Sequence, residues 1–350
     1  MENKFQPPGD PTELLRYRDG IYAGALLGAA IAELGFFNRL AEKPMNLKAL
    51  CASFHLAERP ADVMVTLFSA MRLIQYVNGK YSVTKLARNF LFDKSPSCLR
   101  PYFASMADRS DCQDLLAVLR AGKPVGLPGV SSRAPWATAM RSEFFADDFT
   151  RMMHCRGLFH GPALAKRLEL GGRRRLLDIG GGSGVYACSI LAKHRLLTAT
   201  VLERPPVDKI TRRYVSEMGF AKRADVISGD MLADPLPRSY DVHLFSNVLH
   251  DWPGEAVRKL IRKSFSALPR DGMIAIHDSH LNRKKTGPLA VAAYSVLLMA
   301  STEGKCYSIS EIEKFLREAG FADIRCRETA SDRSVITARK PTLRTPAAKI

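Results

Sequence analysis

The chain has 350 residues, which is long enough for two domains, and its 46% hydrophobic and 25% charged residues are ordinary values for a globular protein. No stretch approaches the roughly 20 apolar residues of a membrane span. The start, "MENKFQPPGDP", has an acid and prolines where a signal peptide would need an apolar core. We therefore expect a soluble, cytoplasmic protein with no membrane partner.

The formal net charge of +17 raises the question of a nucleic-acid partner. Positive charge is in excess in each of the segments 1–100, 101–170, 171–282 and 283–350, and no Lys/Arg block alternates with aromatic residues. A diffuse excess of this kind argues against nucleic acid. The seven cysteines are odd in number and form no CxxC pair, so neither a disulfide framework nor a zinc ribbon is indicated.

The first hundred residues combine apolar helices with a short hairpin. Residues 11–40 carry leucines, alanines and aromatics at helical spacing, and a short helix follows them. We expect a turn around Arg59 and Pro60, a longer helix over 62–73, and a hairpin whose Asn78-Gly79 pair suits a type I′ turn. This order is typical of a winged helix. The segment holds little of the net charge, so we expect a dimerisation platform rather than a DNA-binding unit.

Residues 100–170 contain several predicted helices that are rich in Phe and Met. Core packing explains such residues, and so does the lining of a pocket for an aromatic ligand. The sequence leaves both interpretations open.

From Arg173 onwards strands and helices alternate, which predicts a parallel sheet with helices on both faces. The last two strands are joined by a tight polar turn, so a closing hairpin should add an antiparallel strand. The strands are expected at 174–180, 197–203, 224–230, 240–247, 272–278, 322–330 and 333–340, and the helices at 184–194, 205–219, 253–268, 288–302 and 309–319.

Acids and glycines cluster where the first three of these strands end. Asp178 precedes a loop with glycines at 180, 181, 182 and 184, where missing side chains let the backbone approach a ligand. Glu203 ends the second strand and can accept two hydrogen bonds from a ribose diol. Asp230 and Met231 follow the third strand and could hold an adenine, through its exocyclic amine and its ring face.

The loop departs from the dinucleotide fingerprint G-x-G-x-x-G, because position 185 is valine. Asp178 would repel a pyrophosphate but suits a cationic amine. A nucleoside that bears an amino acid and a sulfonium therefore fits this site better than NAD.

The successive motifs "LLDIGGGSG", "VLERP", "SGDML" and "FSNVLHDWPGE" resemble those of class I S-adenosylmethionine-dependent methyltransferases. They are most similar to the small-molecule O-methyltransferase family of caffeic acid, acetylserotonin and bacterial natural-product enzymes. The likeness covers nearly the whole chain, including a winged-helix dimerisation domain. It implies that Gly180 and Gly182 face the cofactor, that Glu203 binds its ribose, that Asp230 with Met231 binds its adenine, and that His250 is the general base.

The chemistry of methyl transfer supports the role of His250 independently. The reaction needs alignment of acceptor and methyl, and a base with a pKa near neutral activates a hydroxyl. Alternatively, His250 is a core histidine with satisfied hydrogen bonds. Asp278 ends the fifth strand and is expected to orient the imidazole. Asp251 is expected to cap the following helix, with Pro253 in its first turn.

Two positions depart from the family pattern. Cys306 stands where a second flanking glutamate is usual. Ser246 stands where a lysine often contacts the cofactor, and we expect Ser246 to lie among the cofactor-binding residues. The departure at Cys306 removes a carboxylate that the resemblance would place beside His250. His277 and His280 could suggest a metal site, but their spacing at a strand end argues against one.

We therefore expect an α/β protein with a Rossmann-like doubly wound sheet and an antiparallel C-terminal strand, preceded by a winged-helix domain. The expected parts are a dimerisation domain at 1–100, a helical connector at 101–170 that contributes to the acceptor pocket, a catalytic domain at 171–340 and a disordered tail at 341–350. The leading hypothesis is a homodimeric O-methyltransferase for a hydroxylated aromatic or polyketide-like metabolite. C- or N-methylation, and a winged-helix regulator that senses a ligand, are the alternatives.

Overall fold

The computed structural model describes residues 9–124 and 136–342; the expected tail falls, from residue 343, outside the described residues. The chain divides into two compact units. Of the described residues, the sheet unit holds 9–12, 137–280 and 309–342. The helical unit holds 13–124, 136 and 281–308.

This division differs from the expected boundaries at 100 and 170. The expected connector is split, because helix α10 (Glu143–Arg167) packs against α11 (Val185–Lys193) of the sheet unit. Helix α14 (Leu289–Ser301), from the expected catalytic domain, packs against α5 (Glu58–Ala70) of the helical unit. Burial explains the second difference, since every α14 residue from Val291 to Ser301 is buried.

The helical unit is built around a cluster of phenylalanine rings. Phe36 lies with its ring centroid 5.3 Å from that of Phe54 and 5.5 Å from that of Phe68. Its remaining helices are α1 (Thr12–Asp19), α2 (Ala23–Ala32), α3 (Phe36–Glu42), α4 (Leu47–Phe54), α6 (Lys85–Phe90), α7 (Arg100–Ala104) and α8 (Ser110–Ala121). Among the described residues, no single helix has both the length and the apolar character to cross a membrane, although the bent pair Thr12–Ala32 and Phe36–Glu42 meets both criteria when taken together.

The winged-helix order predicted from the sequence is present in this unit, with one correction. Strands β1 (Ile74–Val77) and β2 (Lys80–Val83) form the expected hairpin, and Asn78 and Gly79 have φ of 50° and 78°, as a type I′ turn requires. The expected turn around Arg59 and Pro60 is wrong, because α5 already begins at Glu58. Proline is compatible with this first turn, since its missing N–H has no partner there.

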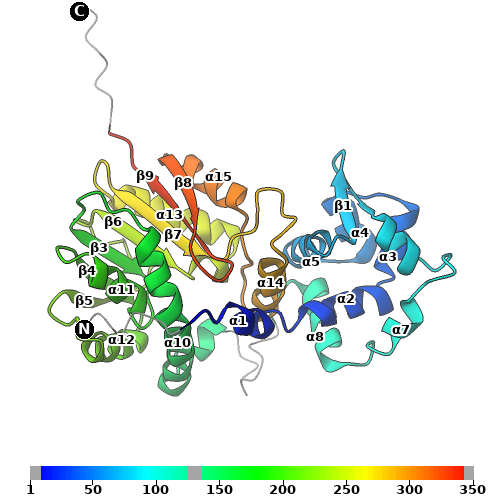
Figure 1. Ribbon diagram of the computed structural model, residues 1–350, viewed down its shortest axis with the longest axis horizontal. Helices are drawn as coiled ribbons and strands as arrows, with labels where there is room; N and C mark the ends of the chain where they lie inside the picture. Colours follow the sequence, from blue (N-terminus) through cyan, green and yellow to red (C-terminus); the bar gives the residue numbers. More distant parts are fainter. Residues whose placement is uncertain (1–8, 125–135, 343–350) are drawn as a thin grey trace, which may run out of the picture. The chain divides into compact units, whose positions relative to one another are not determined.

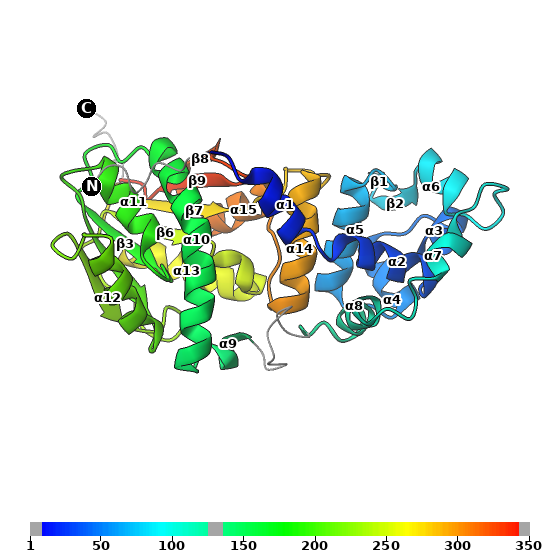
Figure 2. The same cartoon turned by 60° about the horizontal axis from the view of Figure 1, so that its bottom comes forward.

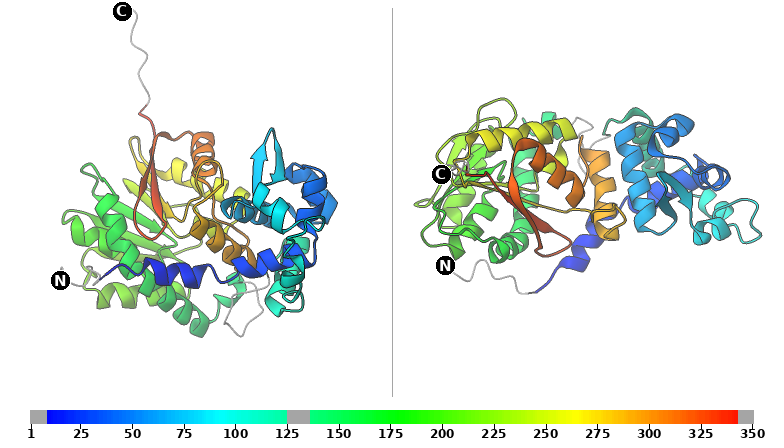
Figure 3. Two further views of the ribbon diagram at one scale, coloured as in Figure 1. Left: turned by 45° about the vertical axis from the view of Figure 1, so that its right-hand side comes forward. Right: turned by 90° about the horizontal axis from the view of Figure 1, so that it is seen from above.

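The sheet unit contains a seven-stranded sheet in the order β5-β4-β3-β6-β7-β9-β8 (Figure 1). All neighbours from β5 to β7 pair in parallel, and β9 runs antiparallel to both β7 and β8. The doubly wound sheet with an antiparallel C-terminal strand is thereby confirmed, and its closing hairpin is the orange and red pair in Figure 3. The strands are β3 (Arg175–Ile179), β4 (Thr198–Glu203), β5 (Ala224–Ser228), β6 (Val242–Ser246), β7 (Met273–Asp278), β8 (Ala322–Glu328) and β9 (Ser334–Arg339).

The chain winds outwards from β3 in one direction and from β6 in the other, so β3 and β6 border the switch point of the sheet. Right-handed crossovers then place α11 and α12 on one face and α13 on the opposite face. The remaining elements of this unit are α9 (Trp136–Ala139), α12 (Val207–Glu217), the 3₁₀ turn η2 (Leu249–Asp251), α13 (Gly254–Ala267) and α15 (Ile309–Ala319).

Helix α10 approaches α11 closely through two glycines, and the two helices run side by side in Figure 2. A Cβ on Gly157 would lie 2.1 Å from Cγ1 of Val185, and a Cβ on Gly161 would lie 2.3 Å from Oγ of Ser189. Side chains at these positions would force the helices apart. The two glycines therefore set the distance of α10 from the loop that precedes α11.

Gly157→Ala tests this packing. Alanine in a helix interior is normally more stable than glycine by about 1 kcal/mol, but here the added methyl overlaps a buried, β-branched Val185. We expect a lower melting temperature and a loss of about 1–3 kcal/mol in unfolding free energy. Gly24→Ala is the matched control, because a Cβ at that helical position meets nothing within 4 Å. Equal stabilisation by both substitutions would contradict the close approach.

Candidate active site

The loop between β3 and α11 runs through the glycines predicted from the sequence. Gly182 has a φ of 56°, and a Cβ built on it meets nothing within 4 Å, so its outer side is open. Gly181 faces inwards, because a Cβ there would lie 2.5 Å from Oδ2 of Asp178 and 2.8 Å from Cγ1 of Val201. The loop therefore presents bare backbone on one side and covers a carboxylate on the other.

Asp178 is the covered carboxylate, and its side chain is fully buried. Among the described residues no donor meets full hydrogen-bond geometry with its oxygens, although the nearby Ala187 N–H acts to lower its pKa. Burial, and then the nearby charge of Glu203, raise its pKa to about 7. The structure thus places Asp178 beneath Gly181, and its expected contact with a cationic ligand stays a prediction.

Glu203 links the end of β4 to the glycine loop. Its Oε1 accepts a hydrogen bond from the Gly182 N–H at 2.8 Å, and its Oε2 accepts one from the Arg204 N–H at 3.0 Å. Burial raises the pKa of Glu203, while these two backbone N–H groups act in the opposite direction. These two bonds hold the carboxylate beside the loop, and its expected contact with a ribose stays a prediction.

Asp230 and Met231 lie at the end of the neighbouring strand β5. Oδ1 of Asp230 accepts a hydrogen bond from the Leu232 N–H at 2.8 Å, and its Oδ2 lies 3.7 Å from Nη1 of Arg204. Sδ of Met231 would lie 3.6 Å from a Cβ on Gly180. The ends of β3, β4 and β5 therefore bring the expected cofactor residues together at one edge of the sheet.

Ser246, another expected cofactor residue, contacts a buried histidine. It ends β6, is buried, and its Oγ lies 3.0 Å from Nδ1 of His277. Nε2 of His277 lies 3.1 Å from Oγ1 of Thr329, and Nδ1 of His280 lies 2.8 Å from Oγ of Ser334. Burial lowers the pKa of His277 to about 3 and that of His280 to about 4. Within 9–124 and 136–342, no group of three or more His, Cys, Asp or Glu is placed to hold a metal ion.

The structure pairs His250 with Asp278, as the sequence predicted. His250 lies in η2, directly after β6, and its Nδ1 is 2.5 Å from Oδ1 of Asp278 at the end of β7. The same carboxylate oxygen accepts a hydrogen bond from the Ser279 N–H at 2.7 Å. With its proton on Nδ1, the imidazole has its basic lone pair on Nε2. Val248 connects this pair to the loop, since its Cγ2 would lie 3.2 Å from a Cβ on Gly180.

The neighbouring carboxylates raise the pKa of His250 by more than its burial lowers it. Burial alone lowers its pKa, but the carboxylates of Asp278 and Asp251 act against it, and the net shift is upwards from the ordinary value of 6.5. Burial likewise opposes ionisation of Asp278, yet the charge and hydrogen bond of His250 bring the pKa of Asp278 below its usual value. The pair therefore stabilises an imidazolium.

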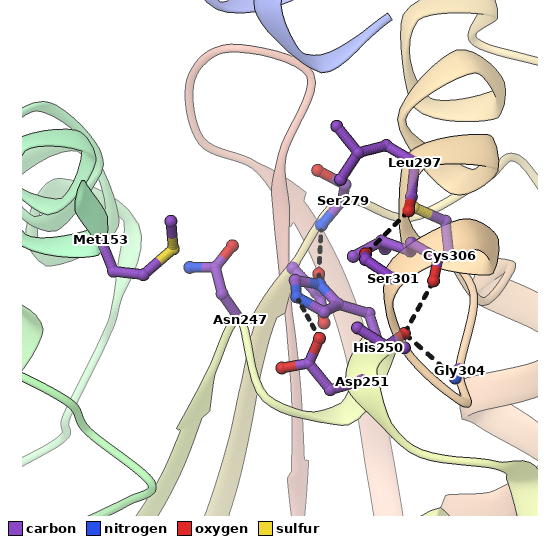
Figure 4. Close-up of polar contacts among 12 residues, drawn as sticks. Met153, Asn247, His250, Asp251, Ser279, Leu297, Ser301, Gly304 and Cys306 are labelled. Carbon is purple, nitrogen blue, oxygen red and sulfur yellow. Dashed lines mark hydrogen bonds and ion pairs between the residues drawn. The ribbon is translucent and has the colours of Figure 1, made fainter. Parts of the chain in front are cut away.

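Asp251 does not cap a helix, although its sequence position predicted a cap. Helix α13 begins at Gly254, its N-cap residue is Pro253, and no side-chain cap is present. Oδ1 of Asp251 instead lies 3.6 Å from Nε2 of His250 (Figure 4). Burial, with the charge of Asp278 as a further contribution, raises the pKa of Asp251 to about 6. The only signal in the sequence was the adjacency of His and Asp, which a 3₁₀ turn converts into contact.

Asn247, which no sequence motif indicated, connects two other side chains near the site. Its φ of 53° is left-handed, its Nδ2 donates to the Tyr186 hydroxyl at 2.8 Å, and its Oδ1 accepts from Nε of Arg333 at 3.3 Å. Figure 4 shows the side chains of Met153, from α10, and Asn247 pointing toward one another. Cys306 belongs to the helical unit, where its backbone N–H donates to Oγ of Ser295 at 3.1 Å.

Comparison with known proteins identifies the family. A family model described as an O-methyltransferase domain matches residues 114–322, which is more than half of the chain. The 3-hydroxy-5-methyl-1-naphthoate 3-O-methyltransferase of Streptomyces sahachiroi is 30% identical over 332 residues, which cover 92% of each chain. An L-tyrosine C(3)-methyltransferase of Streptomyces lavendulae is 29% identical, over 83% of this chain and 82% of the relative.

A solved structure agrees with these sequence relatives. The crystal structure of an O-methyltransferase family 2 protein from Planctomyces limnophilus, in complex with apigenin, is 33% identical. It superposes with a TM-score of 0.87 and covers 95% of this chain and 97% of its own. The resemblance drawn from the motifs is thus confirmed. The chain belongs to the O-methyltransferase domain family and is an S-adenosylmethionine-dependent O-methyltransferase.

Proposed function

We propose that the enzyme methylates a hydroxyl group of a small aromatic or polyketide-like acceptor, with His250 as the general base. The observation that carries this proposal is the buried His250–Asp278 pair at the same sheet edge as the glycine loop. The named relatives support the acceptor class, since one acts on a hydroxynaphthoate and the crystal structure holds apigenin.

Each residue of the pair has a defined part in the proton transfer. Nε2 of His250 takes the proton of the acceptor hydroxyl as the oxygen becomes nucleophilic. Asp278 fixes the ring through Nδ1 and stabilises the imidazolium that forms. Asp251 adds negative charge on the Nε2 side.

The residues around the loop fit S-adenosylmethionine, which supplies an electrophilic methyl group on a sulfonium. The open side of Gly182 admits a ligand to the backbone, and Glu203 is placed to bind a ribose diol. Asp230 and Met231 are assigned to the adenine. The buried carboxyl group of Asp178 lies beneath the loop, and its ionised form would attract a ligand that carries a cationic amine. Ser246 holds His277, so its contact with the cofactor stays an untested prediction.

C-methylation is the second candidate, because one relative is named as an L-tyrosine C(3)-methyltransferase. Incubation with labelled S-adenosylmethionine and a panel of phenols, hydroxyquinones and amines, followed by mass spectrometry, distinguishes O-, C- and N-linked products. Labelling of none of them by a protein that binds the cofactor would contradict the proposed acceptor class.

His250→Ala tests base catalysis. We expect turnover to fall by about 10²–10⁴-fold, because the acceptor hydroxyl loses its proton acceptor, while the affinity for S-adenosylhomocysteine changes less than about threefold. Calorimetry and product assays measure the two effects. His55→Asn, at an exposed position with a φ of 54°, is the control for removal of a histidine. Undiminished methylation by the alanine variant would favour a mechanism of alignment alone.

The dependence of kcat/KM on pH gives a second test of His250 as the base. A base must be neutral to act, so kcat/KM should rise with pH through a midpoint above 6.5, where His250 loses its proton. Asp278→Asn keeps the side-chain shape and removes the charge, so it should move this midpoint downwards. An unmoved midpoint would assign the ionisation to another group.

Asp178→Asn tests the buried acid beneath the loop. Its folded pKa of about 7 exceeds the ordinary value of 3.8, so ionisation favours unfolding as the pH rises between these values. The variant should gain stability relative to the unmodified protein by on the order of 1.4 kcal/mol per pH unit in that window. Chemical unfolding at pH 4–8 measures the difference, with the exposed Asp225→Asn as the control. A difference independent of pH would show that Asp178 is ionised when buried.

We also expect a homodimer that forms through the helical unit. Helix α1 and its C-terminal extension carry Leu14, Tyr17 and Ile21 at helical spacing, with exposed fractions of 74%, 78% and 47%. A row of large apolar side chains in water favours association. Light scattering at micromolar concentration should give twice the 38.8 kDa mass of the chain. Replacing Leu14 and Tyr17 by serine should shift the equilibrium to monomer, and a monomer in the unmodified protein would contradict the proposal.

A further inference from the structure

A side chain from α10 contacts the glycine loop. Nδ1 of His154 lies 2.9 Å from Oγ of Ser183, the residue between Gly182 and Gly184. Ser183 is only 3% exposed, so its hydroxyl is turned into the protein and away from solvent. The contact joins two segments 29 residues apart in the sequence.

The imidazole of His154 is itself held in place. It stacks on the ring of Tyr214 in α12, with centroids 4.4 Å apart and an interplanar angle of 29°. One helical turn further along α10, Gly157 contacts Val185, which fixes the distance between the helix and the loop. Burial lowers the pKa of His154, against an opposing effect of Glu217, and this favours the neutral ring, whose nitrogens can donate to or accept from a hydroxyl.

Two further groups hold the residue before Ser183. The Gly182 N–H donates to Glu203 of β4, and the Gly182 carbonyl accepts from Oγ1 of Thr211 in α12 at 2.5 Å. The loop is thus anchored from β4, α12 and α10 at two consecutive residues. Gly182 and Gly184, with φ of 56° and 74°, are left-handed on either side of the Ser183 contact.

We propose that His154 is a positioning residue for the cofactor loop. Its bond to Ser183 holds the left-handed backbone in the conformation that receives S-adenosylmethionine, so that binding does not have to order the loop. His154 acts through Ser183 and has no role in the proton transfer at His250. The inference rests on the proposed assignment of this loop to the cofactor.

The experiment separates the hydrogen bond from the ring stack. His154→Phe keeps an aromatic ring on Tyr214 and removes the bond, Ser183→Ala removes the bond from the other side, and His154→Asn retains a polar atom near the position of Nδ1. Calorimetry with S-adenosylhomocysteine gives the affinity, and initial rates give KM for S-adenosylmethionine and kcat. Cys155→Ala, at the exposed neighbouring position, is the control.

We expect His154→Phe and Ser183→Ala each to weaken S-adenosylhomocysteine binding by about 2- to 10-fold, the effect of one hydrogen bond. KM for S-adenosylmethionine should rise by the same factor, with kcat at saturation nearly unchanged. The double variant should bind no more weakly than either single variant, since both remove the same bond. His154→Asn should bind within about twofold of the unmodified enzyme, although it lacks the ring.

Unchanged affinity in both single variants, or full additivity in the double variant, would overturn the proposal. A fall in kcat without a rise in KM would also overturn it. If His154→Phe does not fold, Ser183→Ala carries the test alone, because it deletes only one buried oxygen. Failure of the unmodified protein to bind S-adenosylhomocysteine would instead refute the assignment of the loop, so the two failures are distinguishable.

Discussion

The hydrogen bond from the Gly182 N–H to Glu203 ties the loop after β3 to the end of β4, and the rest of the site is arranged around it. For the N–H to reach the carboxylate, the loop must turn tightly over the strand ends. Gly181 makes this turn possible, because any side chain there would overlap Asp178. The two glycines therefore have different roles. Gly181 lets the loop lie close to the sheet, and Gly182 leaves the backbone open on the other side.

This arrangement brings several carboxylates into a buried region. Asp178, Glu203 and Asp251 all have pKa values raised by burial, whereas Asp278 has its pKa lowered because it is paired with His250. Burial of a carboxyl group without a partner costs free energy unless the group stays protonated. Ionisation of Asp178 near neutral pH therefore lowers the stability of the folded protein.

Helix α10 packs against both α11 and the glycine loop. Its glycines let it approach α11, and the same closeness brings His154 within hydrogen-bond distance of Ser183. Close packing also positions His250. Val248, which follows β6, contacts the loop, and His250 lies two residues further along the chain. Close packing at α10 and β6 thus places His250 and the glycine loop at one edge of the sheet.

The sequence by itself determined the alternation of strands and helices, the wing hairpin, the glycine loop and the His250–Asp278 pair. These features follow from local rules: period and turn chemistry define the elements, and parallel strands align their carboxyl ends at one edge. Only the tertiary structure decided that Asp251 faces His250 instead of capping α13, that Asp178 lies beneath Gly181, and that 281–308 packs with the helical unit. The contact of His154 with Ser183 belongs to the same group. Each of these contacts depends on which surfaces meet when the elements pack. The spacing of residues along the chain does not predict how close two packed elements come.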